Sequence, residues 1–200
     1  MLLSHIILAI LWITYGLLHS LFASLFFKKW MERLMTRQFK IYRLYYIMFA
    51  FFAFAGIIFY QVIISSPLLF KTNLFIRVSG SMISITGLVI MIICIHKYFM
   101  QLSGLRSLIE NRTGNRLMIT GIHKYVRHPL YAGTFLFIWG LWIVFPYLSL
   151  LISNTIITIY TLTGIRFEEK KLVIEFGESY IAYQRKTPMI IPDLKTSAQQ

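Results

Sequence analysis

Five long uncharged stretches constrain the fold of this sequence more than any other feature. They cover residues 2–27, 44–65, 78–95, 130–145 and 147–165. A helix needs about 20 apolar residues to cross a hydrocarbon core roughly 30 Å thick. Only Pro146 separates the last two stretches, and helices joined by so short a turn form an antiparallel hairpin. The sequence therefore predicts an all-α polytopic membrane protein with five transmembrane helices, the last two forming a helical hairpin.

The composition agrees with this prediction and argues against a basic nucleic-acid-binding domain. Hydrophobic residues make up 58% of the 200, and the net charge is +13. A chain this apolar must confine its charges to the segments between spans. Because the basic residues interrupt stretches of membrane-spanning length, we expect no nucleic-acid partner. No obligatory protein partner is evident, and the lipid bilayer is the expected surrounding.

Lysine and arginine are distributed unevenly over the connecting segments. Residues 28–43, 96–129 and 166–200 contain six each, whereas residues 66–77 contain two and the turn at Pro146 contains none. The positive-inside rule then places the N-terminus outside and the C-terminus in the cytosol. The membrane would be the plasma or inner membrane of a prokaryote, or the endoplasmic reticulum of a eukaryote.

We expect a single membrane-embedded domain over residues 1–200. Residues 1–98 would form three N-terminal spans, and residues 99–200 a cofactor-binding loop, the hairpin and a cytosolic C-terminal helix. The polar stretch 97–126 is a candidate lid or wall, since long loops beside a site often have that role. Residues 168–183 have helix-forming composition, and that helix would lie at the inner surface or extend the fifth span.

Two polar clusters flank the predicted hairpin. The first, residues 121–133, contains two histidines, one arginine and two tyrosines directly before an apolar stretch; the second comprises residues 166–169 and 176–183. Polar groups so close to a membrane-spanning segment cost free energy unless they bind something. We expect the two clusters to fold onto each other at the cytosolic face and to hold a small charged cofactor.

The residues of these clusters fit some kinds of site better than others. No metal is expected, because HxxH, HExxH and CxxC spacings are absent and the adjacent Glu168 and Glu169 would point about 100° apart on a helix. Neither GxSxG nor GxGxxG occurs, which argues against a serine hydrolase and a dinucleotide fold. A zwitterionic cofactor such as S-adenosylmethionine fits better, because a carboxylate can pair with its amino group or sulfonium and Arg127 with its carboxylate.

The motifs in both clusters resemble the isoprenylcysteine carboxyl methyltransferase superfamily. The matching positions are Gly121, Arg127, His128, Pro129, Tyr131 and Gly133, then Glu168, Glu169, Leu172, Phe176, Gly177, Tyr180 and Tyr183. Phospholipid N-methyltransferases share related C-terminal features. In the first half, residues 18–24, 42–46 and 103–106 look like the methanethiol S-methyltransferase and NnrU-type branch.

This resemblance implies an integral membrane S-adenosylmethionine-dependent methyltransferase acting on a small or lipophilic acceptor, namely a thiol, a prenylcysteine carboxylate or a lipid. It also implies a cofactor pocket capped by the cytosolic C-terminal segment. By match, the cofactor-binding residues are Asn115, Arg116, Leu117, Met118, His123, Tyr125, Arg127, His128, Pro129, Leu130, Tyr131, Glu168 and Glu169.

The chain departs from the superfamily at two positions that bear on the acceptor. Tyrosine is common where this chain has His123, and the prenylcysteine enzymes carry an arginine where this chain has Gly164. Arg166 would then either bind the acceptor in place of that arginine or anchor the helix at the membrane interface. A thiol acceptor must lose its proton, and His19 or His123 could take it, although His19 could equally serve packing. The candidate catalytic residues are therefore Arg166, His19 and His123.

Two other functions stay open at this point. Membrane sterol or double-bond reductases share similar C-terminal features but bind NADPH. An NnrU-like protein would be non-catalytic and would serve in assembly or transport. Cofactor titration separates the first from a methyltransferase, and the consequence of replacing Glu168 or His128 separates the second.

Overall fold

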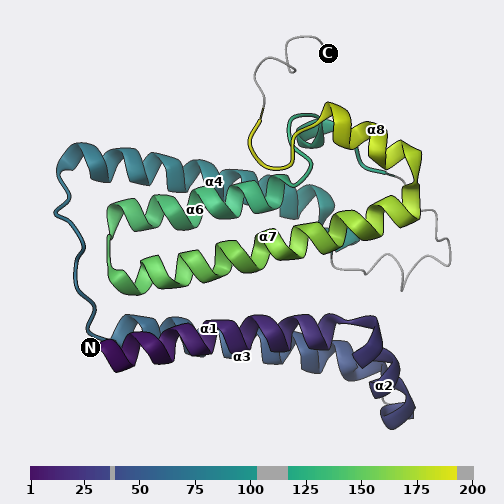
Figure 1. Ribbon diagram of the computed structural model, residues 1–200, viewed down its shortest axis with the longest axis horizontal. Helices are drawn as coiled ribbons and strands as arrows, with labels where there is room; N and C mark the ends of the chain where they lie inside the picture. Colours follow the sequence, from purple (N-terminus) through teal and green to yellow (C-terminus); the bar gives the residue numbers. More distant parts are fainter. Residues whose placement is uncertain (37–38, 103–116, 193–200) are drawn as a thin grey trace. The chain divides into compact units, whose positions relative to one another are not determined.

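The computed structural model describes residues 1–36, 39–102 and 117–192, and these residues are mostly helical (Figure 1). The elements are α1 (Leu2–Ala23), α2 (Leu25–Met35), α3 (Phe39–Ile63), α4 (Leu74–Leu102), the short 3-10 helix η2 (Gly121–Lys124), α6 (Pro129–Val144), α7 (Leu148–Phe176) and α8 (Glu178–Lys186). Within the described ranges, β pairing is limited to an isolated bridge between Leu68 and Tyr147. The all-α prediction is confirmed.

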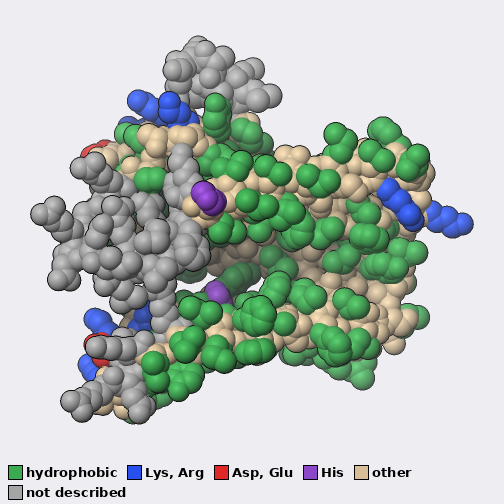
Figure 2. All heavy atoms as spheres, turned by 180° about the vertical axis from the view of Figure 1, so that it is seen from behind, with side chains coloured by type: hydrophobic (Ala, Val, Ile, Leu, Met, Phe, Trp, Pro, Cys, Tyr) green, Lys and Arg blue, Asp and Glu red, His purple; other side chains and the backbone are tan. Residues whose placement is uncertain are grey.

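Four of these helices are long and apolar enough to cross a membrane. They are α1, residues 44–63 of α3, residues 74–96 of α4, and α7. Hydrophobic side chains cover much of the face shown in Figure 2, and lysine and arginine side chains lie near its left and right edges. The chain is therefore an integral membrane protein. The predicted span at 130–145 corresponds to α6, which is apolar but has only 16 residues, so a count of five spans stays a prediction.

One helix boundary differs from the predicted one, and another agrees with one of the two arrangements predicted for residues 168–183, namely an extension of the last span. The first stretch, residues 2–27, is divided at Ser24, which is extended (φ −67°, ψ 148°) and accepts a hydrogen bond from the Phe27 N–H at 3.2 Å. Serine in this geometry is a favoured N-cap, so it ends α1 and starts α2. The last stretch continues past residue 165, and α7 ends only at Gly177 (φ 55°, ψ −132°). That backbone conformation is accessible essentially to glycine alone.

The described chain divides into two compact units. The first comprises residues 1–71 and 146–160, and its core is built on Leu8, Trp12 and Ile57, with Tyr15 and Tyr60 packed against it. Polar contacts tie its loops together, since the Ser66 hydroxyl lies 3.0 Å from the His5 ring and accepts from the Ser149 N–H at 2.9 Å.

The second unit comprises residues 72–145 and 161–200, and α4 and α6 pack closely within it. The close approach depends on glycine. A Cβ on Gly87 would lie 2.5 Å from the carbonyl oxygen of Gly133 and from the backbone nitrogen of Phe137. Ser84 adds a hydrogen bond across the same pair, donating to the Phe137 carbonyl at 2.7 Å. Small residues of this kind let apolar helices associate in a membrane.

Candidate functional site

The first polar cluster forms a compact turn that leads into α6. Gly121 begins the turn with φ 66°, a left-handed value that favours glycine. The turn ends at His128, the N-cap of α6, and Pro129 occupies the first helical turn, where its missing N–H has no cost. The side chains of residues 127 and 128 are consequently fixed at the start of an apolar helix.

The segment after α8 pairs with this turn through its backbone. We call residues 187–189 the C-terminal strap. The Arg127 N–H donates to the Pro188 carbonyl at 2.9 Å, and the His128 N–H donates to the Met189 carbonyl at 3.0 Å. Residues some sixty positions apart in the sequence thus share two adjacent hydrogen bonds, and the polar clusters before and after the hairpin lie together.

The Arg127 side chain is held by groups of the chain itself. Its Nε donates to Glu169 Oε1 at 2.7 Å, and one terminal nitrogen donates to the backbone carbonyls of Gln184 (3.1 Å) and Thr187. The Arg127 and Glu169 side chains are only 11% and 15% exposed. A shielded, charge-assisted pair of this kind is among the stronger polar contacts in a protein. These contacts connect the start of α6 to α7, α8 and the C-terminal strap.

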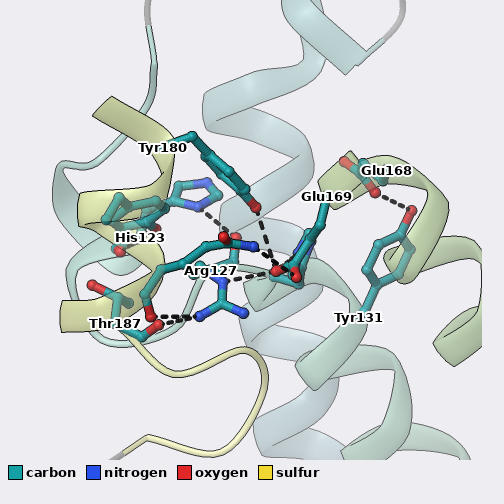
Figure 3. A network of polar contacts seen from close by, with 10 residues as sticks. His123, Arg127, Tyr131, Glu168, Glu169, Tyr180 and Thr187 are labelled. Carbon is teal, nitrogen blue, oxygen red and sulfur yellow. Dashed lines mark hydrogen bonds and ion pairs between the residues drawn. The ribbon is translucent and has the colours of Figure 1, made fainter. Parts of the chain in front are cut away.

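Glu169 lies at the centre of this network (Figure 3). Besides Arg127, its carboxylate lies 3.1 Å from His128 Nε2 and accepts from the Tyr180 hydroxyl at 3.4 Å and from the Gln184 amide at 3.1 Å. His128 and Tyr180 are buried. Burial and the neighbouring Glu169 carboxylate raise the pKa of Tyr180 above its usual range, so the phenol stays protonated and donates over the physiological pH range.

Glu168 has a different environment from its neighbour. Its carboxylate accepts a hydrogen bond from the Tyr131 hydroxyl at 3.2 Å, at an exposed position, and the two side chains face each other apart from the Arg127 network (Figure 3). The Tyr131 ring lies 5.8 Å from the His128 ring, centroid to centroid. The divergence of adjacent side chains on a helix explains why one glutamate is enclosed by protein groups and the other faces outward.

His123 and Arg166, both predicted to be catalytic, lie in the second unit but in different surroundings. His123 Nδ1 lies 3.1 Å from the Arg127 carbonyl, which can only accept, so Nδ1–H is the donor in this contact. Arg166 is exposed and lines an open hollow with Glu169, other residues of α7, and Gln184 of α8. Glu168 does not line that hollow.

The third catalytic candidate, His19, lies in the first unit. Its Nε2 is 3.0 Å from the Tyr46 hydroxyl, and its ring packs beside Tyr15 at a centroid distance of 5.6 Å. Of the predicted cofactor residues, Tyr125 is 53% exposed, and Leu117 and Met118 are half-buried. Leu130 is half-buried in the first turn of α6. Asn115 and Arg116, with the rest of residues 103–116 of the predicted lid, lie outside the described residues.

Comparison with known proteins decides the family. A family model described as "Protein of unknown function (DUF1295)" matches residues 2–187, which include both polar clusters. The chain belongs to the DUF1295 family. No solved structure matches it.

Relatives of this DUF1295 chain include named methyltransferases. The methanethiol S-methyltransferase of Crocosphaera subtropica is 31% identical over 190 residues, which cover 89% of this chain and 71% of the relative. That of Pseudomonas deceptionensis is 38% identical over 76 residues, 37% of this chain and 28% of the relative. The protein-S-isoprenylcysteine O-methyltransferase of Schizosaccharomyces pombe is 37% identical over 87 residues, 42% and 36% respectively. The predicted superfamily resemblance is confirmed.

The residues of the DUF1295 chain that sequence reasoning missed are mostly on α8 and the C-terminal strap. Gln184 and Thr187 enclose the Arg127 guanidinium, and two strap carbonyls pair with the turn before α6. Gln184 follows Tyr180 by four residues, so helical periodicity predicts a shared face. The strap contacts leave no signal in the sequence, because any residue supplies a backbone carbonyl.

Proposed function

We propose that this chain is a membrane methyltransferase that transfers the methyl group of S-adenosylmethionine to a small thiol or another lipophilic acceptor. The observation that carries the proposal is the match to a methanethiol S-methyltransferase over 89% of this chain. The geometry of the second unit supports it, because the two motifs that carry the resemblance come together around Glu168 and Glu169.

The outward-facing side of the network fits this cofactor. Glu168 presents a carboxylate and Tyr131 an aromatic ring beside it, with the buried His128 ring packed behind that of Tyr131. A carboxylate suits the amino group or the sulfonium, and an aromatic face attracts a cation or stacks on a purine. The cofactor, when bound, supplies an already activated methyl group. Glu168 and Tyr131 would bind and orient it, and positioning accounts for much of the rate in such a transfer.

Arg127 and Glu169 have another role in this proposal. Their charged groups contact each other and the C-terminal segment, so we assign them to holding α8 and the strap against the start of α6. The predicted use of Arg127 as the partner of the cofactor's carboxylate would add a contact to a guanidinium that already makes three within the chain.

Gly164 favours a thiol over a carboxylate acceptor. It lies one helical turn before Glu168 and therefore on the same face of α7, and nothing lies within 4 Å of the position that its Cβ would occupy. No cationic side chain is thus provided by residue 164 to pair with an acceptor carboxylate. A thiol needs only to lose a proton as it attacks, and His123 Nε2 and the His19 ring are the candidates to take it.

The cytosol is the proposed side for this chemistry. All three basic connecting segments, including the one before α6 and the one after α7, would face inward by the positive-inside rule. The acceptor would reach the site from the cytosol or from the lipid.

The decisive experiment uses the purified full chain with radiolabelled S-adenosylmethionine and a panel of thiols, prenylcysteines and phospholipids. We expect label transfer to a small thiol and saturable binding of S-adenosylhomocysteine. Glu168→Gln should lose at least tenfold in S-adenosylhomocysteine affinity, whereas Glu32→Gln, on exposed α2, should not change it. Saturable NADPH binding without S-adenosylhomocysteine binding would instead indicate a reductase and overturn the proposal.

A further inference from the structure

The amphipathic helix α2 is a separate feature that the proposed function does not use. It has 11 residues, three of them cationic and one acidic, and it follows α1 directly at the Ser24 corner. The 22 residues of α1 are about 33 Å long at 1.5 Å per residue. This length matches a hydrocarbon core of roughly 30 Å, so α1 crosses the core and α2 begins at its edge.

The inner row of α2 attaches it to the rest of the first unit. Phe27 and Met31 are four residues apart and half-buried. The Phe27 ring lies 4.9 Å from that of Phe22 on α1 and 6.3 Å from that of Tyr42 on α3. Tyr42, buried, also donates to the Phe22 carbonyl at 2.6 Å. The orientation of α2 about its own axis is therefore set by packing.

The next row around the helix is apolar and uncovered. Phe26, Trp30 and Leu34, again four residues apart, are 78%, 49% and 61% exposed. Together they form a continuous strip along α2, because residues separated by four share a helix face. Large apolar side chains in such a strip are costly in water and are normally covered by another surface.

The row beyond this strip is cationic. Lys29 and Arg33 are exposed and lie, by the 100° rotation per residue, on the side of the apolar strip opposite to Phe27. Around α2 the order is thus packed row, uncovered apolar row, cationic row. A helix with tryptophan, phenylalanine and leucine beside lysine and arginine is typical of one lying in a membrane interface.

We propose that α2 lies in the membrane interface and binds anionic phospholipid headgroups of the bilayer that the protein spans. The strip Phe26, Trp30 and Leu34 contacts the acyl-chain boundary. Lys29 and Arg33 pair with the negatively charged headgroups at the adjacent level. The position of α2 at the end of a spanning helix, together with its charge, selects lipid as the occupant over a second copy of this basic chain, which would bring like charges together.

Charge removal tests the headgroup contact. The detergent-solubilised full chain is titrated with phosphatidylglycerol, and bound lipid is counted by native mass spectrometry. Each cation near an anionic surface contributes roughly fivefold in affinity, so Lys29→Gln/Arg33→Gln should weaken binding by about tenfold or more. The matched control, Lys71→Gln/Arg77→Gln, removes the same charge from the loop after α3 and the first turn of α4, and should bind like the wild type. Equal weakening in both double variants, or in neither, would overturn the proposal.

Fluorescence tests the depth of the apolar strip. The difference between wild type and Trp30→Phe isolates the emission of Trp30 in proteoliposomes. We expect quenching by lipids brominated near the headgroup end of the chain and little quenching by aqueous acrylamide. Strong acrylamide quenching would place α2 in water. A change of oligomeric state in Trp30→Phe would instead make the strip a protein interface, and either result refutes the lipid assignment.

Discussion

Replacing Glu168 and Glu169 with glutamine, one at a time, should distinguish the glutamate that stabilises the fold from the glutamate proposed to bind the cofactor. In Glu169→Gln the Arg127 guanidinium, 11% exposed, would lose the negative charge of its carboxylate partner and keep neutral acceptors, namely the new amide oxygen and two backbone carbonyls. Removing one partner of a fully buried pair costs about 3–5 kcal/mol. Because both side chains retain some exposure, we expect about 2–4 kcal/mol here.

Glu168→Gln is the matched control. Glu168 is exposed, and its side chain has one hydrogen bond, at 3.2 Å, among those described above. A substitution at such a surface position usually changes stability by no more than about 0.5 kcal/mol. The same variant should nevertheless lose S-adenosylhomocysteine affinity, since Glu168 faces outward beside Tyr131. The two variants therefore have opposite expected profiles, one unstable and one unable to bind.

The assay is denaturant unfolding of the purified protein in one detergent, followed by circular dichroism, with and without S-adenosylhomocysteine. The ligand should stabilise the wild type and fail to stabilise Glu168→Gln. Limited proteolysis should cut the Glu169→Gln variant after α8 faster than the wild type. If Glu169→Gln unfolds within about 1 kcal/mol of the wild type, or if Glu168→Gln is the unstable variant, the division of roles is wrong.

Four further predictions concern single positions. Gly87→Ala should destabilise the α4–α6 pair by about 1–3 kcal/mol, because its Cβ would lie 2.5 Å from the Gly133 carbonyl. In contrast, Gly164→Ala, with open space, should be stabilising by up to about 1 kcal/mol in the same unfolding assay. Gly177→Ala should cost about 1–3 kcal/mol through backbone strain at φ 55°, seen as a lower unfolding temperature, and an unchanged temperature would refute it. For Tyr180 the folded-state pKa is raised above its unfolded value. Its contribution to the free energy of unfolding is therefore fully present below about pH 10 and is lost as pH rises through the folded-state pKa. Tyr180→Phe should therefore show a smaller loss of stability than the wild type between neutral pH and pH 11, and identical slopes would contradict this.

Much of the site was predictable as a set of residues but not as a set of contacts. The motifs around Arg127, His128 and Glu169 identify the groups, and these meet in the second unit. The sequence does not distinguish Glu168 from Glu169, since both are glutamates in one helix and differ only in direction. Packing of α8 against α7 decides which carboxylate is enclosed.

The sequence by itself determined the membrane character and the helical class. Long uncharged stretches can satisfy their backbone hydrogen bonds in lipid only as helices or closed barrels, and their length and composition favoured helices. The sequence also has a serine at position 24, which can either cap a new helix or continue the first one. Packing of α2 against Phe22 and Tyr42 favours the cap.

Only the tertiary structure decided the placement of Arg127 and the C-terminal strap. Their hydrogen bonds join residues about sixty positions apart through backbone carbonyls. Side-chain identity carries no information about such contacts, because every residue offers the same carbonyl. The direction that α8 takes after Gly177 decides which backbone carbonyls lie close enough to bind the guanidinium. That direction is set by how the helices pack.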